Sequence, residues 1–370
     1  MKRYKRILGI FLVNLAVFSV GIVIIELLCG AWLNPKNLNR LNLIKDQTFK
    51  YDVSGLYETA SPIIKYSRDK YGLRGWYGDD PSQIDLLTVG GSTTDQRYIS
   101  DDSTWQNVLQ KQFASIGTPI VVANAGVDGQ STFGHIKNFD WWFPYVPGLK
   151  PRYILFYIGL NDFYKGENSD YDALVYPGQH SLVAAIRENS ALWHLARTIR
   201  GAYRATVVLK IGHRKVDFAM VQWTREPLQN NYVFMSSRLD AYAQRLRILV
   251  DRTRNLNSRA IFVTQPSRKF RLTKNGVYGL ADVTTYDGRQ INGVDYYHMI
   301  KQFNSVMEAV CRERQVLLID LAAESEWEDG DFYDFAHMTP RGARKVGLYL
   351  FERLRAIANA AEPGAAPDKE

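Results

Sequence analysis

The stretch Ile84-Asp-Leu-Leu-Thr-Val-Gly-Gly-Ser-Thr-Thr94 indicates the fold class of this chain. A short apolar run ends here in two glycines and a serine, as expected for a buried strand followed by a sharp turn. Four comparable runs follow at 119–123, 153–158, 260–264 and 316–319, with helical periodicity between them. Because strands alternate with helices, we predict a three-layer α/β/α sandwich around a five-stranded parallel sheet.

Ligands of parallel sheets bind beyond the carboxyl ends of the strands, so the loops after these runs are candidate sites. In the first loop, Gly90 and Gly91 allow a turn that exposes the hydroxyl of Ser92. A tight turn without chemistry is one alternative. A phosphate-cradling loop is another, although it would need a Gly-Lys-Ser/Thr ending and no lysine occurs here.

Two further loops carry candidate oxyanion donors. Gly126 lies in the loop 124–129, where a glycine either lets backbone N–H groups approach a reacting centre or is only a loop glycine. Asn161 follows the third predicted strand, and its amide N–H can donate to a developing oxyanion. Asx-turn chemistry is the alternative for Asn161-Asp162. The position at the end of an aromatic and aliphatic strand favours a functional Asn161.

A carboxylate and an imidazole lie three residues apart before the last predicted helix, 339–358. If Asp334-Phe-Ala-His337 forms a helical turn, the two side chains share a face. Asp334 would hold the His337 ring in one tautomer, and the other ring nitrogen would take the Ser92 proton. The remaining histidines lack such a partner and are assigned to the surface or to packing: His135, His180, His194, His213 and His298.

The four loops together resemble the blocks of the SGNH (GDSL-type) hydrolases, which supply Ser, Gly, Asn and His in that order. Here these residues are Ser92, Gly126, Asn161 and His337, with Asp334 in the family's Asp-x-x-His arrangement. The resemblance spans the region 86–346. One departure is that the usual Gly-Asp-Ser-Leu reads Gly-Gly-Ser-Thr, which keeps the nucleophile but weakens inference of the substrate from ordinary GDSL lipases.

The resemblance implies a flavodoxin-like fold and a catalytic triad of Ser92, Asp334 and His337. It also implies an oxyanion hole formed by the backbone N–H groups of Ser92 and Gly126 and by the side chain of Asn161. Asp162 would then support the structure and take no part in the chemistry. Ser92 would attack an ester carbonyl, and water would resolve the acyl-enzyme.

An apolar run from Ile7 to Ile25 follows four basic residues and contains one strongly polar residue, Asn14. At about 1.5 Å per residue it reaches nearly across a hydrocarbon core of roughly 30 Å. A cleaved signal peptide is the alternative, but the run is long and no A-x-A-like site follows it. We predict a single-pass anchor at 7–33 after a cytoplasmic tail at 1–6. The body would lie on the extracytoplasmic side, as in a bacterial inner-membrane protein facing the periplasm.

The rest of the chain is predicted to form a juxtamembrane linker at 34–80, a hydrolase domain at 81–358 and a disordered tail at 359–370. An insertion at about 163–235 is too long for an ordinary connection. Its helical stretch 182–205 carries arginines beside leucines and a tryptophan. It could form a lid or a membrane-facing basic element, but we favour a helical insertion packed on the domain with a solvated basic face.

Charge and cysteine content limit the classes of partner, metal and cofactor that the chain is expected to bind. The net charge is +8, but the basic residues are scattered, so we expect no nucleic acid and favour anionic lipid headgroups or an acidic glycan. Cys29 and Cys311 provide neither a disulfide framework nor a metal-ligand spacing. We therefore expect no metal and no cofactor.

Three functions follow as hypotheses. The first is a serine esterase that removes a short acyl group, such as acetate, from a glycan or another envelope substrate. The second is an O-acyltransferase that uses the same site on a glycan. It would need an envelope acyl-transfer or polysaccharide-assembly partner, because a single span cannot move an acyl donor across the bilayer. The third is a non-catalytic glycan-binding or assembly protein, against which the complete residue set argues.

Overall fold

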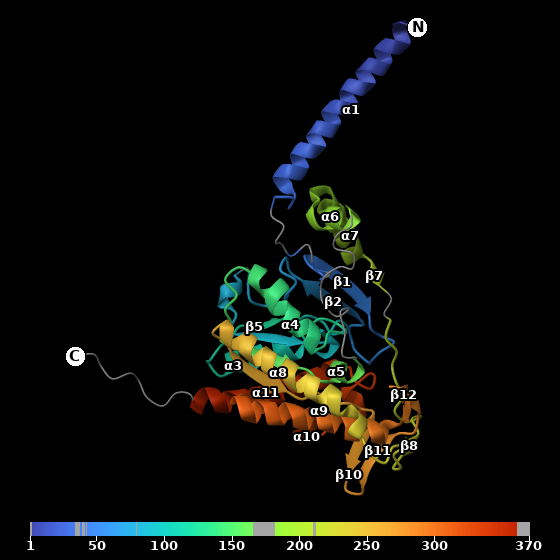
Figure 1. The fold of residues 1–370 in the computed structure, drawn as a ribbon, viewed down its shortest axis with the longest axis vertical. Helices are drawn as coiled ribbons and strands as arrows, with labels where there is room; N and C mark the ends of the chain where they lie inside the picture. Colours follow the sequence, from blue (N-terminus) through green and yellow to red (C-terminus); the bar gives the residue numbers. More distant parts are fainter. Residues whose placement is uncertain are drawn as a thin grey trace, which may run out of the picture.

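The computed structural model describes residues 2–33, 38, 41, 43–78, 80–165, 182–209 and 212–360. Its body is built around a six-stranded sheet with the order β14-β9-β6-β4-β5-β3 (Figure 1). Five of these strands are parallel, as predicted, and β3 (Arg74–Gly75) pairs antiparallel with β5 at one edge. The parallel strands are β4 (Leu86–Gly90), β5 (Val122–Asn124), β6 (Tyr153–Tyr157), β9 (Arg259–Val263) and β14 (Leu317–Ile319).

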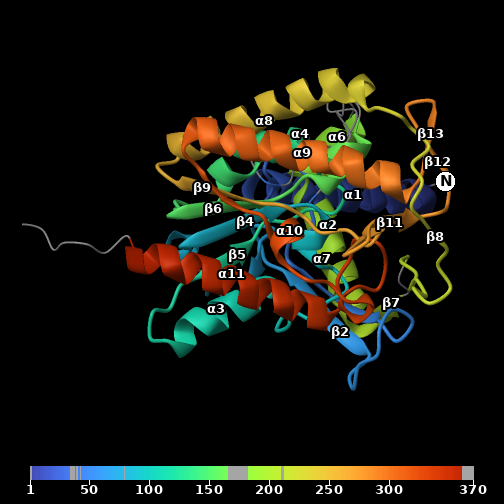
Figure 2. The ribbon, with the colours of Figure 1, turned by 90° about the horizontal axis from the view of Figure 1, so that it is seen from below.

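Helices cover both faces of this sheet, which confirms the predicted α/β/α sandwich (Figure 2). Helices α3 (Trp105–Ser115) and α11 (Pro340–Ala360) pack against each other on one face. Helices α4 (Thr132–Trp141), α8 (Ser236–Asn255) and α9 (Gly293–Arg314) cover the other. Short helices follow three strands at their carboxyl ends: α2 (Ser92–Asp95), α5 (Leu160–Tyr164) and α10 (Leu321–Glu324).

The continuous apolar runs arise because both faces of the sheet are buried. In β6, Ile154 and Phe156 belong to the core under α4, α8 and α9, whereas Leu155 and Tyr157 belong to the core under α3 and α11. Successive side chains of a strand point to opposite faces, so a strand covered on both sides has no polar face. This geometry fixes the carboxyl ends of the strands at one edge of the sheet.

The segment predicted as a juxtamembrane linker contains regular structure. Strands β1 (Gln47–Asp52) and β2 (Ile63–Arg68) form an antiparallel pair, and β7 (Val208–Leu209) joins β1 in parallel. An aromatic core that includes Phe49, Tyr51 and Tyr66 stabilises this small sheet. Alternating burial in β1 and β2 shows that the sheet rests on the body with one face only.

The predicted insertion contains two helices instead of one, α6 (Leu182–Asn189) and α7 (Ala191–Thr206), and part of it (166–181, 210–211) lies outside the described residues. The insertion also contains β8 (Trp223–Thr224), which forms a small sheet with β10 (Phe270–Thr273) and β11 (Gly276–Leu280) from further along the chain. The hairpin of β12 (Thr284–Tyr286) and β13 (Arg289–Ile291) follows. Single 3₁₀ turns occur at Pro81–Gln83, Phe143–Tyr145, Val233–Met235 and Asp329–Asp331.

Helix α1 (Lys2–Cys29) extends away from the body (Figure 1). Its segment Arg6–Cys29 has a mean hydropathy of 2.7 and is long and apolar enough to span a membrane. At the other terminus, α11 continues to Ala360, and the rest of the predicted tail (361–370) lies outside the described residues.

Candidate active site

Ser92 lies at the carboxyl end of the central strand β4, where two glycines turn the chain into α2. A Cβ on Gly90 would lie 2.1 Å from Thr94 Oγ1 and 2.5 Å from the carbonyl oxygen of Tyr157, so only glycine fits there. Gly91 is the N-cap residue of α2, and Ser92 is its first residue. The turn thus presents the Ser92 hydroxyl at the edge of the sheet where ligands bind.

The structure brings Ser92, His337 and Asp334 into one hydrogen-bonded chain. Ser92 Oγ lies 2.7 Å from His337 Nε2, and His337 Nδ1 lies 2.7 Å from Asp334 Oδ2. The segment forms a bend and not the predicted helical turn, because Asp334 Oδ1 accepts hydrogen bonds from the backbone N–H groups of Ala336 and His337. One carboxylate oxygen therefore shapes the loop, and the other orients the imidazole.

The carboxylate of Asp334 is kept in its ionised form. Burial by itself would raise its pKa, but the hydrogen bond and charge of His337, with the two backbone N–H donors, hold the pKa below the ordinary value. An ionised Asp334 accepts a hydrogen bond from His337 Nδ1–H, so the ring proton stays on Nδ1. The Nε2 atom is then left as an acceptor facing Ser92, which is the arrangement that a general base requires.

Asn161 lies beside the Ser92 turn, and a network around Gln130 positions it. Asn161 Nδ2 donates to the backbone carbonyl of Gln130 at 2.8 Å. The Gln130 side chain is held by His135 Nδ1 at 2.9 Å and by Asn138. A Cβ on Gly91 would lie 2.2 Å from Asn161 Nδ2, so the amide packs directly against the turn. An amide nitrogen has two hydrogens, and the second finds no partner among the described residues.

Gly126 does not occupy the position that the family resemblance implies. Its N–H donates to Asn124 Oδ1 at 2.8 Å, and its carbonyl accepts from Arg68 Nη2. A Cβ would lie 2.4 Å from the backbone nitrogen of Asp95, so glycine is required here for close packing. In this arrangement the Gly126 N–H is already paired and unavailable to an oxyanion.

Gly129, in the same loop, was not singled out by sequence reasoning. It has φ +74° and open space where a Cβ would be. Its neighbours on both sides belong to the site, since Asp128 lines the pocket beside Ser92 and the Gln130 carbonyl accepts from Asn161. The sequence signal that could have identified Gly129 is a second glycine three residues after Gly126 in the same loop.

Behind the Ser92 turn lies a buried ion pair. Arg68 Nη2 is 2.5 Å from Asp95 Oδ1, and Tyr66 donates to the same oxygen at 2.8 Å. Burial would raise the pKa of Asp95, but the positive charges of Arg68, Arg97 and Arg74 lower it overall. Through its bond to the Gly126 carbonyl, Arg68 also joins the first loop to the second.

Asp162 supports the fold next to the site. It is buried and accepts hydrogen bonds from the backbone N–H and the hydroxyl of Thr132, the first residue of α4. Arg245 on α8 pairs with the same carboxylate at 3.5 Å. Asp162 therefore joins α4, α5 and α8 and fixes the short helix α5 that carries Asn161.

A small pocket of about 20 Å³ opens beside Ser92. His213, which sequence reasoning assigned to the surface or to packing, lines it together with Tyr333 and His337. His213 Nδ1 lies 2.9 Å from the Tyr333 hydroxyl, and the His213 and His337 rings are 4.6 Å apart. Burial and the charge of His337 lower the pKa of His213, which keeps a second positive charge away from the site. No sequence signal marks His213, because the insertion delivers it from more than a hundred residues away.

His213, Asp334 and His337 also form a group with metal-ligand character. One donor atom from each lies within 4.8 Å of the others. Both nitrogens of His337 and the Oδ2 of Asp334 are, however, already used in the hydrogen-bonded chain to Ser92. The arrangement therefore favours proton transfer, and a cation would have to break that chain to bind.

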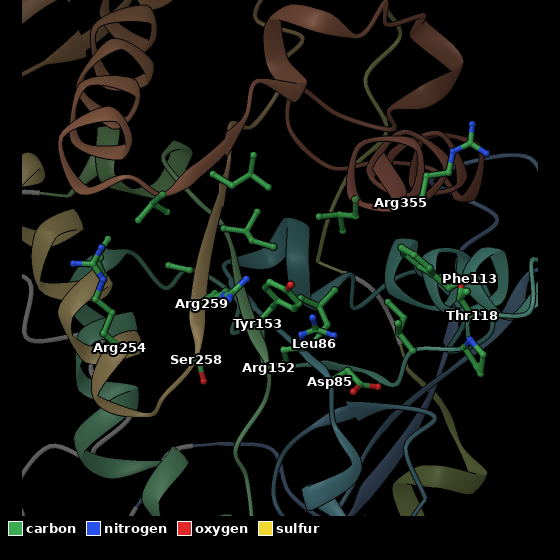
Figure 3. Close-up of a pocket in the computed structure, with 18 of the residues that line it drawn as sticks. Asp85, Leu86, Phe113, Thr118, Arg152, Tyr153, Arg254, Ser258, Arg259 and Arg355 are labelled. Carbon is green, nitrogen blue, oxygen red and sulfur yellow. The ribbon is translucent and has the colours of Figure 1, made fainter. Parts of the chain in front are cut away.

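A larger cleft of about 720 Å³ lies at the amino ends of the parallel strands, on the side opposite to Ser92 (Figure 3). Its lining includes the amino ends of the strands, among them Leu86, Tyr153 and Arg259. Ser92 follows the carboxyl end of β4, so the sheet separates the cleft from the hydrogen-bonded chain. The cleft is not part of the candidate active site.

Solved structures with low similarity include a variant of the acetyl xylan esterase Axe2 from Geobacillus stearothermophilus. It is 14% identical, covering 76% of this chain and 96% of that chain, with a TM-score of 0.40. The psychrotrophic esterase EstA from Pseudoalteromonas sp. is 11% identical, covering 74% and 98%, with a TM-score of 0.40. At these values neither carries an argument about the substrate of this chain. No curated protein sequence matches the chain.

The model of the GDSL-like Lipase/Acylhydrolase family matches residues 88–345, which is well over half of the chain. This range contains all four loops at the carboxyl edge of the sheet, from Ser92 to His337. The chain therefore belongs to the GDSL-like lipase/acylhydrolase family and is a serine ester hydrolase.

Proposed function

We propose that the protein is a serine esterase that removes a short acyl group, such as acetate, from a glycan or another envelope substrate. Ser92 is the nucleophile, His337 the general base and Asp334 the residue that orients the base. The observation that carries this proposal is the continuous hydrogen-bonded chain Ser92–His337–Asp334, with 2.7 Å at each step, at the edge of a small pocket.

The proposed reaction has two halves. Ser92 Oγ attacks the ester carbonyl carbon while its proton passes to His337 Nε2, and the departing alcohol takes that proton as the acyl–oxygen bond breaks. Water then attacks the acyl-enzyme, with His337 acting again as base, and releases the acid and free Ser92. Asp334 stabilises the imidazolium that forms in each half.

We assign the oxyanion donors to the Ser92 backbone N–H, the Asn161 side chain and the Gly129 backbone N–H. Ser92 is the first residue of α2, and the first N–H groups of a helix have no partner within the helix. Asn161 Nδ2 keeps one hydrogen after its bond to Gln130. Gly129 replaces Gly126 because the Gly126 N–H is paired with Asn124.

The size of the pocket supports a short acyl group. About 20 Å³ is little more than the space needed to hold one water molecule, which favours a small acyl group such as acetyl over a long acyl chain. Apolar and aromatic side chains, including Ile99, Tyr98 and Met338, contribute to its wall. A methyl group packed among them gains more than a charged or hydroxylated acyl group would.

The rim of the pocket supports a polyhydroxylated alcohol part. Arg97 and Asp128 form an ion pair with 3.3 Å between nitrogen and oxygen, and both side chains are partly exposed. Such a pair offers donors and acceptors side by side, which suits vicinal hydroxyls of a sugar. The carbohydrate would lie along this rim while its ester enters the pocket.

The anchor supports an envelope location for the reaction. We propose that α1 spans the membrane with its N-terminus in the cytoplasm, since Lys2, Arg3, Lys5 and Arg6 precede the apolar run. The catalytic domain would then face the extracytoplasmic side. An O-acyltransferase would form the same acyl-enzyme but would transfer the acyl group from Ser92 to a sugar hydroxyl instead of to water. It would depend on a membrane partner that supplies the acyl donor.

The test uses the full chain in detergent or nanodiscs, labelled with a fluorophosphonate probe and assayed with aryl acetate and aryl octanoate. Ser92→Ala and His337→Ala are compared with the matched controls Ser115→Ala and His298→Ala, which lie away from the pocket. We expect labelling and acetate hydrolysis in the wild type and in the controls only, with acetate preferred over octanoate.

Each other outcome has a defined meaning. If Ser92→Ala and His337→Ala are both still labelled, the nucleophile lies elsewhere. Equal rates with octanoate would contradict the short-acyl specificity. Transfer of acetate to added oligosaccharide that exceeds hydrolysis would favour the acyltransferase. A folded wild type that neither labels nor hydrolyses would favour a glycan-binding protein.

A further inference from the structure

One carboxylate at the end of α1 makes several hydrogen bonds to the helices of the insertion. Glu26 accepts hydrogen bonds from the backbone N–H groups of Ala191 at 2.9 Å and Leu192 at 3.2 Å, and from the Ser190 hydroxyl at 2.7 Å. Trp32 Nε1 donates to it at 2.7 Å. These contacts place a negative charge at the N-terminus of α7, where the helix dipole stabilises it.

This contact fixes the depth of α7 relative to any membrane that α1 crosses. Glu26 lies three residues before Cys29, the last residue of α1, and hence about 4.5 Å from the helix end. A carboxylate at the bilayer centre would be costly, whereas at the end of a span it lies near the headgroups. The first turn of α7 must therefore lie at the level of the membrane–water interface. Figure 1 shows α6 and α7 at the body end of α1.

The surface of α7 has an apolar stripe that is open to solvent. Leu192, Leu195, Ile199 and Tyr203 are spaced at i, i+3, i+7 and i+11, so they line one side of the helix. Their exposed fractions are 40, 57, 62 and 69%. Helix α6 adds three exposed apolar side chains next to them, Leu182, Val183 and Ile186. A contiguous apolar surface of this kind marks an interaction site.

The stripe points away from the protein body. Helix α7 packs on β1. Residues 191, 194 and 197, spaced at i, i+3 and i+6 on the side that faces away from the stripe, are less exposed than the stripe. The charge of Arg197 acts on Lys45, which is buried in the body, and this confirms which side of α7 faces inward. Arg200 is exposed beside the stripe. The helix thus presents leucine, isoleucine and tyrosine outward with a basic residue at the margin, as interfacial helices do.

We propose that the α6–α7 hairpin lies in the interface of the same membrane that α1 crosses, with the stripe of α7 and the exposed side chains of α6 buried among lipid headgroups and acyl chains. The proposal rests on α1 spanning the membrane. The occupant of the apolar surface is lipid because Glu26 joins this surface directly to the end of the span, and because basic residues suit anionic headgroups. This reverses the expectation that the insertion only packs on the domain.

The hairpin would also set the height of the active site above the bilayer. Strand β7 follows α7 and pairs with β1 of the body, and His213 in the pocket follows β7 by four residues. With two attachments, α1 and the hairpin, the body cannot rotate freely about a single linker. The pocket therefore meets its substrate at a defined distance from the membrane surface.

The test measures the depth of single labels in proteoliposomes of phosphatidylcholine and phosphatidylglycerol that hold the full chain. An environment-sensitive fluorophore is attached at Ile199→Cys or Leu195→Cys in a Cys29→Ser background. Lipids with spin labels near the headgroup quench interfacial labels, and lipids with spin labels in the acyl chain quench labels deep in the bilayer. Ser115→Cys, exposed on α3, is the aqueous control, and Leu15→Cys in α1 is the membrane control. We expect quenching at positions 199 and 195 to exceed that at 115 at least about threefold.

The control positions separate the test of the interfacial α6–α7 hairpin from the test of the membrane span α1. Quenching at 15 with none at 199 and 195 would overturn the interfacial hairpin and leave the anchor unaffected. A lack of quenching at 15 would overturn the span on which the proposal rests. If labels at 199 are shielded in detergent and cross-link between two chains, a second copy covers the stripe, and the lipid assignment is wrong. Esterase turnover, measured in the same samples, reports the proposed function independently.

Discussion

The substitution Gly91→Ala tests the oxyanion assignment without touching any polar group. The added Cβ would lie 2.2 Å from Asn161 Nδ2 and 3.2 Å from the carbonyl oxygen of Gln130. Comfortable contact needs about 3.5 Å, so the Asn161 amide must retreat by about 1 Å or more. The φ of Gly91 is −87°, outside the left-handed region that favours glycine. The change therefore displaces a donor and leaves the turn in place.

The expected loss of turnover follows from this displacement. Removal of one oxyanion donor costs on the order of 10²–10³ in kcat, or about 2.7–4 kcal/mol. A misplacement of about 1 Å has an effect of similar size. We expect Gly91→Ala to lower kcat by about 100-fold or more, with little change in KM, since the lost interaction forms only in the transition state.

The assay is steady-state hydrolysis of an aryl acetate by the full chain, with melting temperature as the measure of folding. Gly55→Ala is the matched control, because its added Cβ meets nothing within 4 Å. Asn161→Ala should lose as much activity as Gly91→Ala. The double variant should lose no more than either, because without the Asn161 amide the new methyl group has little to displace.

Full activity in a folded Gly91→Ala variant would show that Asn161 does not act as the donor placed here. Additive losses in the double variant would equally contradict the reasoning, since they would mean that the two residues act separately. A melting temperature that falls well below that of Gly55→Ala would trace the effect to the fold and refute the local displacement.

Three further predictions concern buried charges and the pocket. Burial, with the charge of Arg197, lowers the pKa of Lys45 to about 7, so the unfolded chain binds more protons from about pH 7 to pH 10 and stability rises across that window. Lys45→Met should therefore raise the melting temperature more at pH 7 than at pH 10, and an equal gain would contradict this. Arg68→Gln leaves Asp95 buried without its closest cation and should lower the free energy of unfolding by about 3–5 kcal/mol in denaturant titrations, whereas a loss near zero would contradict the pairing. Zn²⁺ should inhibit turnover through His213 and its neighbours; EDTA should not, and His213→Ala should raise the half-inhibiting concentration about tenfold or more.

The sequence by itself determined the sheet and the positions of the principal site residues. Both faces of the sheet are buried, so its strands appear as apolar runs, and a parallel sheet places the ends of those runs at one edge. Ser92, Asn161 and the Asp334–His337 pair each follow or precede a regular element, and the structure brings them together there. Local patterns sufficed because each of these residues is defined by the element next to it.

Other features were decided by contacts between distant segments. Gly126 and Gly129 look equivalent in the sequence, and only the bonds from Asn124 and Arg68 show that Gly126 is already paired. His213 enters the pocket because β7 pairs with β1 and carries the insertion past the active site.

Contacts between distant segments also decide the structure of the amino-terminal part of the body. The segment 34–80 lacks strong periodicity, yet its strands form because aromatic side chains from β1 and β2 pack with Tyr98 and Tyr333. Likewise, the role of Glu26 as a helix cap depends on residues 190–192, far away in the chain. Hydrogen bonds and packing at such separations leave no mark on local composition. The tertiary structure alone therefore determines that the Gly126 N–H is already paired, which second histidine lines the pocket, and which way the apolar stripe of α7 faces.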